Sequence, residues 1–170
     1  MAQDGVLDAS LLLSLGDASA LDQLWSDPHH RWHVTPISRS EVASEPTRTE
    51  VSRAILNGWL RPTELDMDSP KELTALAYWT RCVDPGEAEA IAIATSRGWV
   101  VGIEDLAAQR RLTRETGSHR WINAAGLLMA AVRAGQLPLA LADAIFVRLD
   151  CYSGYRKRGI VRLSDLAELG

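Results

Sequence analysis

Acidic residues in this chain recur where short apolar stretches end and where helices are expected to begin. The carboxylates in such positions are Asp8, Glu41, Glu87, Glu89, Glu104 and Asp105. In an open α/β sheet, the carboxyl ends of the strands lie along the edge where ligands bind. Because these acids come from separate segments that reach this edge, we expect their side chains to converge there.

A group of converging carboxylates needs a counter-charge, because several anions in one pocket repel one another strongly. Mg²⁺ and Mn²⁺ prefer oxygen ligands and usually keep some of their waters. One such ion, or a pair about 3.5–4 Å apart, can activate a water and steady a phosphodiester during in-line attack. The pattern therefore predicts a divalent-metal site with Mg²⁺ or Mn²⁺ as the cofactor.

Some of these acids have an equally direct structural interpretation as helix caps. Aspartate is favoured at the N-cap, which is where Asp8 and Asp105 stand. The segment Asp84-Pro85-Gly86-Glu87 reads as a capping box with proline at the first helical position. In that interpretation Glu87 serves a backbone amide and not a metal.

The choice between neighbouring acids stays open in two places. Glu89 lies about 200° around the helix from Glu87, so only one of the two can face the site squarely. Glu41 falls one or two turns into its helix, and it has Glu45 as a rival. Both are also compatible with a solvated helix surface.

Short apolar runs alternate with helical periodicity along the chain. Strands are expected at 5–7, 32–35, 99–103 and 119–122. Helices are expected at 11–15, 20–25, 36–43, 47–60, 71–82, 84–97, 105–116, 124–134 and 139–149. Strands that are continuously apolar and alternate with helices predict an α/β fold, with a parallel sheet covered on both faces.

The composition is that of a soluble globular domain, with 170 residues, 46% hydrophobic and 24% charged residues and a net charge of −4. No apolar run is long enough to cross a bilayer, and Leu11-Leu12-Leu13 lacks the basic flank of a secretory signal. The two cysteines, Cys82 and Cys151, cannot form a disulfide framework. We expect a single cytoplasmic domain that does not bind membranes.

The net charge argues against a nonspecific nucleic-acid binder, but the cations are clustered. Nearly all of the 18 Lys and Arg residues are arginine, and two groups stand out. They are Arg110, Arg111, Arg114 and Arg120, then Arg156, Lys157, Arg158 and Arg162. Arginine forks suit phosphate, and a basic rim around an acidic centre suits a nucleic-acid substrate. Solvated surface charge is the alternative interpretation.

Other constellations are weaker. His29, His30 and His33 stand close together after Asp27, but the spacing fits a loop turn better than a zinc site. The chain has no Gly-rich phosphate loop and no GxSxG elbow. The six tryptophans are expected in the core, with base stacking open to one or two of them.

The acidic segments resemble those of PIN-domain proteins. The resemblance is carried by Val6–Ser10, by Gly86–Ala92 with the sequence GEAEAIA, by Ile103-Glu104-Asp105 and by Ala125–Leu128. It runs from residue 5 to about residue 150. The GEAEAIAIA stretch followed by IED at this spacing is the specific part, and it is similar to a branch of the family with a GEAEAIALA segment.

The resemblance implies a Rossmann-like three-layer α/β/α sandwich with a short central parallel sheet. It implies a Mg²⁺- or Mn²⁺-dependent endoribonuclease, often the toxin of a toxin–antitoxin pair, and frequently a homodimer. The chain would then be one PIN-like domain over residues 1–170, with the metal-site core at 5–150 and a basic tail at 151–170.

By position, the resemblance assigns a role to each acid. Asp8, Glu41, Glu87 and Asp105 become the catalytic metal ligands, with Glu89 as the alternative to Glu87 and Glu104 beside Asp105. We expect Arg110, Arg111 and Asn123 to meet the RNA.

Two positions depart from the family pattern. Asn123-Ala124 stands where many relatives have Thr or Ser, and Ile103 stands where Thr is common. These departures favour an alternative, a catalytically weak or inactive PIN-like module that binds nucleic acid or protein. In the toxin hypothesis, a cognate antitoxin would be the main partner.

Overall fold

The computed structural model describes residues 2–27, 29–117, 120–149 and 151–167. Its centre is a parallel five-stranded sheet in the order β3-β2-β1-β4-β5. The strands are β1 (Gln3–Leu7), β2 (His30–Val34), β3 (Leu60–Pro62), β4 (Val100–Gly102) and β5 (Trp121–Ile122). The expected α/β fold with a parallel sheet is therefore confirmed.

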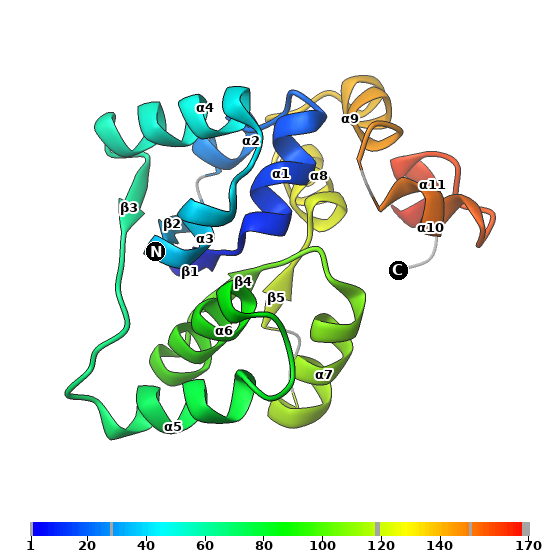
Figure 1. Ribbon diagram of the computed structural model, residues 1–170. Coiled ribbons are helices and arrows are strands. Elements are labelled where there is room, and N and C mark those ends of the chain that lie inside the picture. Colours follow the sequence, from blue (N-terminus) through cyan, green and yellow to red (C-terminus); the bar gives the residue numbers. More distant parts are fainter. Residues whose placement is uncertain (1, 28, 118–119, 150, 168–170) are drawn as a thin grey trace.

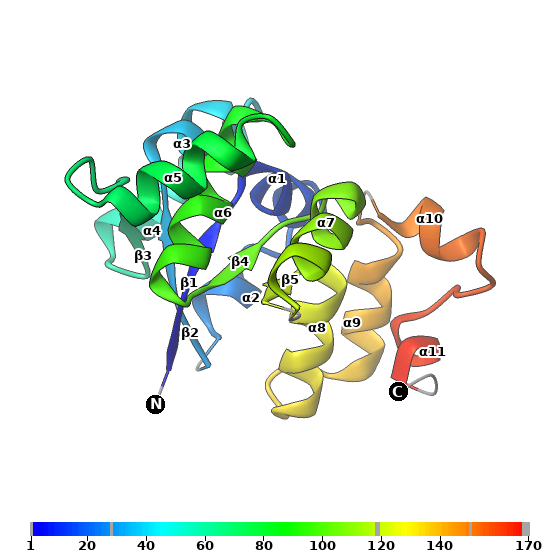
Figure 2. The ribbon, with the colours of Figure 1, turned by 90° about the horizontal axis from the view of Figure 1, so that it is seen from below.

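Helices cover both faces of this sheet (Figures 1 and 2). On one side lie α5 (Pro70–Trp79), α6 (Pro85–Arg97) and α7 (Leu106–Thr116). On the other lie α1 (Ala9–Asp17), α2 (Asp22–Trp25), α4 (Glu45–Leu56), α8 (Ala124–Arg133) and α9 (Leu139–Phe146). The short helix α3 (Pro36–Glu41) follows β2, and α10 (Tyr152–Arg156) and α11 (Leu163–Ala167) close the described chain.

The two faces of the sheet have separate apolar cores because successive strand residues point to opposite sides. Val6 packs into the core beneath α6, and Leu7 packs into the core beneath α1 and α8. Both side chains are fully buried. This is why the strand reads as a continuous apolar run and why it must lie at the centre of the sheet.

Four expectations about where helices end were wrong, the first of them the helix expected at 71–82, which ends at Trp79. The helix expected at 47–60 ends at Leu56, because Gly58 adopts φ +72° and the chain then turns into β3. The helix expected at 36–43 ends at Glu41, where Val42 is extended. The helix expected at 139–149 ends at Phe146. His119, expected in a strand, lies outside the described residues.

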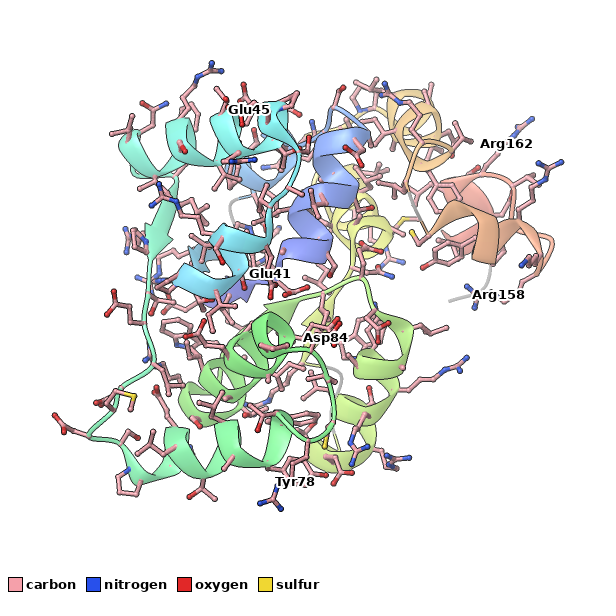
Figure 3. All side chains as sticks on the ribbon, viewed as in Figure 1. Glu41, Glu45, Tyr78, Asp84, Arg158 and Arg162 are labelled. Atoms are coloured by element: carbon pink, nitrogen blue, oxygen red, sulfur yellow. The ribbon has the colours of Figure 1, made fainter. Side chains whose placement is uncertain are left out.

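The tail expected at 151–170 is joined to the rest of the chain by apolar contacts. Ile160 and Leu163 are buried in the core that includes α8 and α9. Arg158 and Arg162 remain exposed on the far side of this segment (Figure 3). None of the helices in the described ranges has the length and apolar character that a bilayer crossing requires.

Candidate functional site

Asp8 stands directly after β1, the central strand, and is only 2% exposed. Its Oδ2 accepts hydrogen bonds from the backbone amide of Ser10 (3.0 Å) and from the Ser10 hydroxyl (2.6 Å), which caps α1. Its Oδ1 is buried and has no hydrogen-bond partner among the described residues. Burial, then the charge of Asp84, raises the pKa of Asp8. The cap therefore uses one oxygen and leaves the other available.

Glu41, the last residue of α3, leans against the start of α6. Its carboxylate sits over the Cα of Gly86, where any Cβ would collide with it, and it accepts a hydrogen bond from the Gly86 amide. Partial burial and the charges of Asp8, Asp84 and Glu89 raise the pKa of Glu41. Figure 3 labels Glu41 and Asp84 on the two sides of the junction of α3 and α6.

Glu87 occupies the first turn of α6. Burial, then the charges of Asp8 and Asp105, raises its pKa to about 7. It accepts a hydrogen bond from the backbone amide of Asp84, which is half of the expected capping box. The other half is absent among the described residues, because the Asp84 side chain makes no capping bond.

Glu89 leaves α6 about 200° around the helix from Glu87, yet its charge acts on the same group of acids. Its charge contributes to the raised pKa of Glu41. Its Oε2 is buried without a hydrogen-bond partner among the described residues. The sequence left the choice between Glu87 and Glu89 open, and the structure gives each of them a neighbour in the acidic group.

Asp105 and Glu104 follow β4. Asp105 caps α7, with Oδ1 accepting from the Ala108 amide at 2.6 Å, and its side chain remains exposed. Glu104 points toward the next element, because its Oε1 accepts from the Ala124 amide at the start of α8. Asp105 thus shares the surroundings of Glu87, whereas Glu104 serves a helix start.

Three residues that the sequence interpretation missed build this edge. Asp84 adds a carboxylate whose charge acts on Asp8, Glu41 and Glu87. The Ser10 hydroxyl accepts from the Glu104 amide (3.1 Å) while it donates to Asp8. Buried Gln109 donates to the carbonyls of Ile103 (2.8 Å) and Glu104 (3.2 Å). Of the three, Ser10 could have been predicted from the sequence, because it stands two residues after an acid at an expected helix start.

The residues expected to meet RNA lie in other surroundings. The guanidinium of Arg111 lies over the ring of Tyr78, 5.8 Å from its centroid, and hydrogen-bonds to the phenol. Arg110 is exposed on α7. Asn123 caps α8 by accepting from the Gly126 amide (2.8 Å) and donates to the Tyr155 hydroxyl (3.1 Å).

The histidines are separated by their partners. His30 contacts Asp27 at 2.7 Å, and His33 contacts Asp4 at 3.0 Å, at the amino-terminal end of the sheet. Over the described ranges, no group of three or more His, Cys, Asp and Glu side chains has the arrangement of a metal site. This applies to the histidines and to the acids as their side chains stand.

The donor set at the acidic edge nevertheless fits a hard divalent cation. The buried oxygens Asp8 Oδ1 and Glu89 Oε2 lack hydrogen-bond donors among the described residues. Burial, and then neighbouring like charges, raises the pKa of Glu41 and Glu87. A cation bound among these carboxylates would give the buried oxygens a partner. It would also offset the repulsion between the neighbouring negative charges. Mg²⁺ and Mn²⁺ take this kind of oxygen donor.

Fold and site together define an α/β protein with a group of electrostatically coupled carboxylates at the carboxyl edge of its parallel sheet. No protein-family model, curated protein or solved structure matches the chain.

Proposed function

We propose that this protein is a Mg²⁺- or Mn²⁺-dependent endoribonuclease. The observation that carries the proposal is the electrostatic coupling around Glu87, whose pKa of about 7 reflects burial and the charges of Asp8 and Asp105. These three acids come from α6, from the end of β1 and from the end of β4. Metal-assisted hydrolysis requires carboxylates that can reach a common ion, and the effect of the Asp8 and Asp105 charges on Glu87 supports this.

In this proposal Asp8, Glu41, Glu87 and Asp105 hold the metal, with Glu89 and Asp84 adjoining them. A bound divalent ion supplies a Lewis acid and lowers the pKa of a water. Ser10 orients Asp8 through its hydroxyl, and Gln109 fixes the turn that carries Asp105. In the metal-free protein, Glu87 with its pKa of about 7 is partly protonated near neutral pH, and binding of the metal would displace that proton.

The resemblance to PIN-domain proteins supports RNA as the substrate. It also supports a role as the toxin of a toxin–antitoxin pair, with a cognate antitoxin and a second copy of the chain as partners. We include these roles in the proposal on that support alone.

A second function is a PIN-like module that binds RNA or protein without cleavage. It is favoured by Asn123, which stands where the family resemblance leads us to expect a hydroxyl and which is engaged in capping α8. The Glu104 carboxylate, bonded to the Ala124 amide, gives the same indication.

Cleavage of single-stranded and structured RNA by the purified chain, with Mn²⁺ and with EDTA, separates the two functions. We expect Mn²⁺-dependent cleavage by the wild type and none by the double variant Asp8→Asn/Asp105→Asn, because both substitutions keep capping oxygens but remove charge. The matched control is Asp4→Asn, at the opposite end of β1, which should cleave like the wild type.

Equal cleavage by the double variant and the wild type would exclude the proposed site. RNA binding by the wild type without cleavage in Mn²⁺ would favour the module. Manganese binding by isothermal titration gives an independent readout, and we expect it to be lost in the double variant.

A further inference from the structure

A hollow lies at the carboxyl edge of the sheet, where the acids also lie. A cavity of about 490 Å³ opens between α3, α4 and the end of β3. Val34 and Pro62, the last residues of β2 and β3, form its floor with Ile55 of α4. Its volume falls within the range of small-ligand sites, about 300–1,000 Å³.

Helix α3 separates this cavity from the acidic site, which is the group of Asp8, Glu41, Glu87 and Asp105. The helix contributes one side chain to each. Arg39 and Glu41 are two residues apart, so their side chains leave the helix about 200° apart. Glu41 leans on Gly86 in the acidic site, and Arg39 lines the cavity. A ligand in the cavity would therefore be the direct neighbour of a substrate held at the acids.

Arg39 is available to bind an anion. It is exposed, and its guanidinium forms no side-chain hydrogen bond, ion pair or ring contact with the residues that the structure describes. Arg48, on the α4 wall, donates to the carbonyl of Ala43 (3.0 Å) and pairs with Glu45 at 3.4 Å. Such exposed pairs contribute little and rearrange easily. Two arginine forks thus suit a phosphate.

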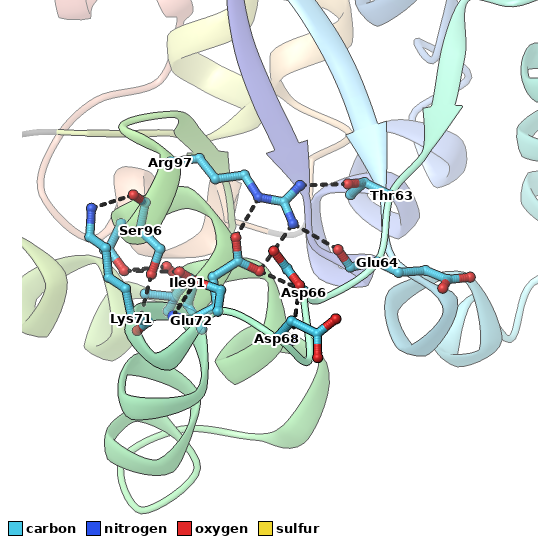
Figure 4. A network of polar contacts seen from close by, with 12 residues as sticks. Thr63, Glu64, Asp66, Asp68, Lys71, Glu72, Ile91, Ser96 and Arg97 are labelled. Carbon is cyan, nitrogen blue, oxygen red and sulfur yellow. Dashed lines mark hydrogen bonds and ion pairs between the residues drawn. The ribbon is translucent and has the colours of Figure 1, made fainter.

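The opposite rim offers an acceptor on a rigid support. Glu64 lines the cavity, and its backbone carbonyl accepts from Arg97 at 2.8 Å. Figure 4 shows the Glu64 carboxylate turned away from Arg97, which also holds Thr63 (2.9 Å) and Glu72. A carboxylate there repels phosphate but accepts hydrogen bonds from amino and hydroxyl groups.

We propose that this cavity is a nucleotide subsite, which takes one phosphate-bearing nucleotide of single-stranded RNA next to the acidic site. Arg39 and Arg48 bind the phosphate, the apolar floor receives the base or sugar, and Glu64 accepts from a base amino group or a ribose hydroxyl. Inorganic phosphate would use only the arginines. The role as a substrate subsite rests on the proposed function.

The local charge explains why such a subsite is needed. The chain has a net charge of −4, and the acidic site itself repels the RNA backbone. A cationic wall one helix away offsets that repulsion and supplies the attraction to phosphate on which nucleic-acid affinity depends.

Isothermal titration in EDTA tests the cavity without the metal. The probes are a nucleoside 5′-monophosphate, the same nucleoside without phosphate, and inorganic phosphate. We expect saturable binding of the monophosphate, weaker binding of the other two probes, and about tenfold weaker monophosphate binding in Arg39→Gln. Arg53→Gln is the matched control, because Arg53 lies on α4 outside the cavity and pairs with Glu50.

Unchanged monophosphate affinity in Arg39→Gln and Arg48→Gln, or no saturable binding by the wild type, would overturn the proposal. Because EDTA removes divalent ions, this result is independent of RNA cleavage in Mn²⁺. In the active protein, Arg39→Gln should raise the KM for RNA about tenfold and leave kcat unchanged. A fall in kcat alone would contradict the subsite role.

Discussion

Glu87 is the residue at which burial and neighbouring charge meet most directly. Its pKa in the folded protein is about 7, against an ordinary value of 4.5. Because the unfolded chain loses this proton at lower pH than the folded chain does, stability falls as pH rises from about 4.5 to about 7. Below that window the carboxyl is protonated in both states and there is no penalty.

We therefore predict that Glu87→Gln stabilises the metal-free protein above pH 7 and has a much smaller effect at pH 5. The gain should be on the order of 1–2 kcal/mol once solvent screening is taken into account. Urea unfolding in EDTA at pH 5 and pH 8, followed by tryptophan fluorescence, measures it. Glu50→Gln, on the exposed surface of α4, should show no such pH-dependent gain.

When metal is bound, the negative charge of Glu87 should stabilise the protein and no longer destabilise it. A bound cation removes the repulsion among the acids, so Mn²⁺ should stabilise the wild type more at pH 8 than at pH 5. In Glu87→Gln that added stability should shrink. A Glu87→Gln variant that responds to Mn²⁺ like the wild type would remove this residue from the ligand set.

At the scale of the element, Gly86 allows α3 and α6 to meet. The Glu41 carboxylate occupies the place of a side chain at residue 86. Alanine is preferred to glycine in helices, by roughly 0.5–1 kcal/mol in the interior and less in the first turn, where Gly86 lies, so stability alone does not require this glycine. Glycine is needed here because the Glu41 carboxylate lies too close to residue 86 to leave room for a Cβ.

We predict that Gly86→Ala leaves thermal stability unchanged or slightly raised and lowers Mn²⁺-dependent cleavage at least about tenfold. The added methyl displaces only the flexible end of Glu41, which costs the fold little but moves a metal ligand. Thermal unfolding and initial cleavage rates measure the two effects. Full activity in Gly86→Ala would mean that Glu41 does not act from this position.

The β4–α7 turn depends on Gln109 in a comparable way. Gln109→Met keeps the side-chain length but leaves the carbonyls of Ile103 and Glu104 without their donor. We predict a loss of about 1–3 kcal/mol in unfolding free energy by urea titration. Exposed Gln136, which bonds to the Ser26 carbonyl, is the control, and Gln136→Met should change stability by less than about 0.5 kcal/mol.

The elements also show which features the sequence can reveal. An acid that follows a buried strand can be read locally, and for this reason Asp8 and Asp105 were placed correctly at the sheet edge. The orientation of Glu104 depends on Ala124, and that of Arg111 depends on Tyr78, both distant in sequence. Strand β3 was missed as a strand because it is short, lies at the edge and contains proline.

At the scale of the whole molecule, α6 connects two distant polar sites. Its first turn carries Gly86 and Glu87 in the acidic edge, and its last residue is Arg97. Arg97 donates two hydrogen bonds to the Glu72 carboxylate of α5, at 2.7 and 3.0 Å. It also donates to the Thr63 hydroxyl and to the Glu64 carbonyl in the segment after β3 (Figure 4). The residues between these ends are mostly buried. A change at Arg97 is therefore a change in how the sheet edge, α5 and α6 are held together.

We predict that Arg97→Met costs about 2 kcal/mol at pH 7.5, because Glu72, 5% exposed, is left buried without its counter-charge. Arg97 holds the pKa of Glu72 below its ordinary value of 4.5. The pair therefore contributes its stability above that value and loses it as pH falls through the lowered pKa.

Urea titration should show a smaller gap in unfolding free energy between Arg97→Met and the wild type at pH 3.5 than at pH 7.5. Arg53→Met, whose partner Glu50 is exposed, should lose less than about 0.5 kcal/mol at either pH. An equal gap at both pH values would show that Arg97 acts through its bonds to Thr63 and Glu64 and its contact with the Trp99 ring, 5.1 Å from guanidinium to centroid, and not through its ion pair with Glu72.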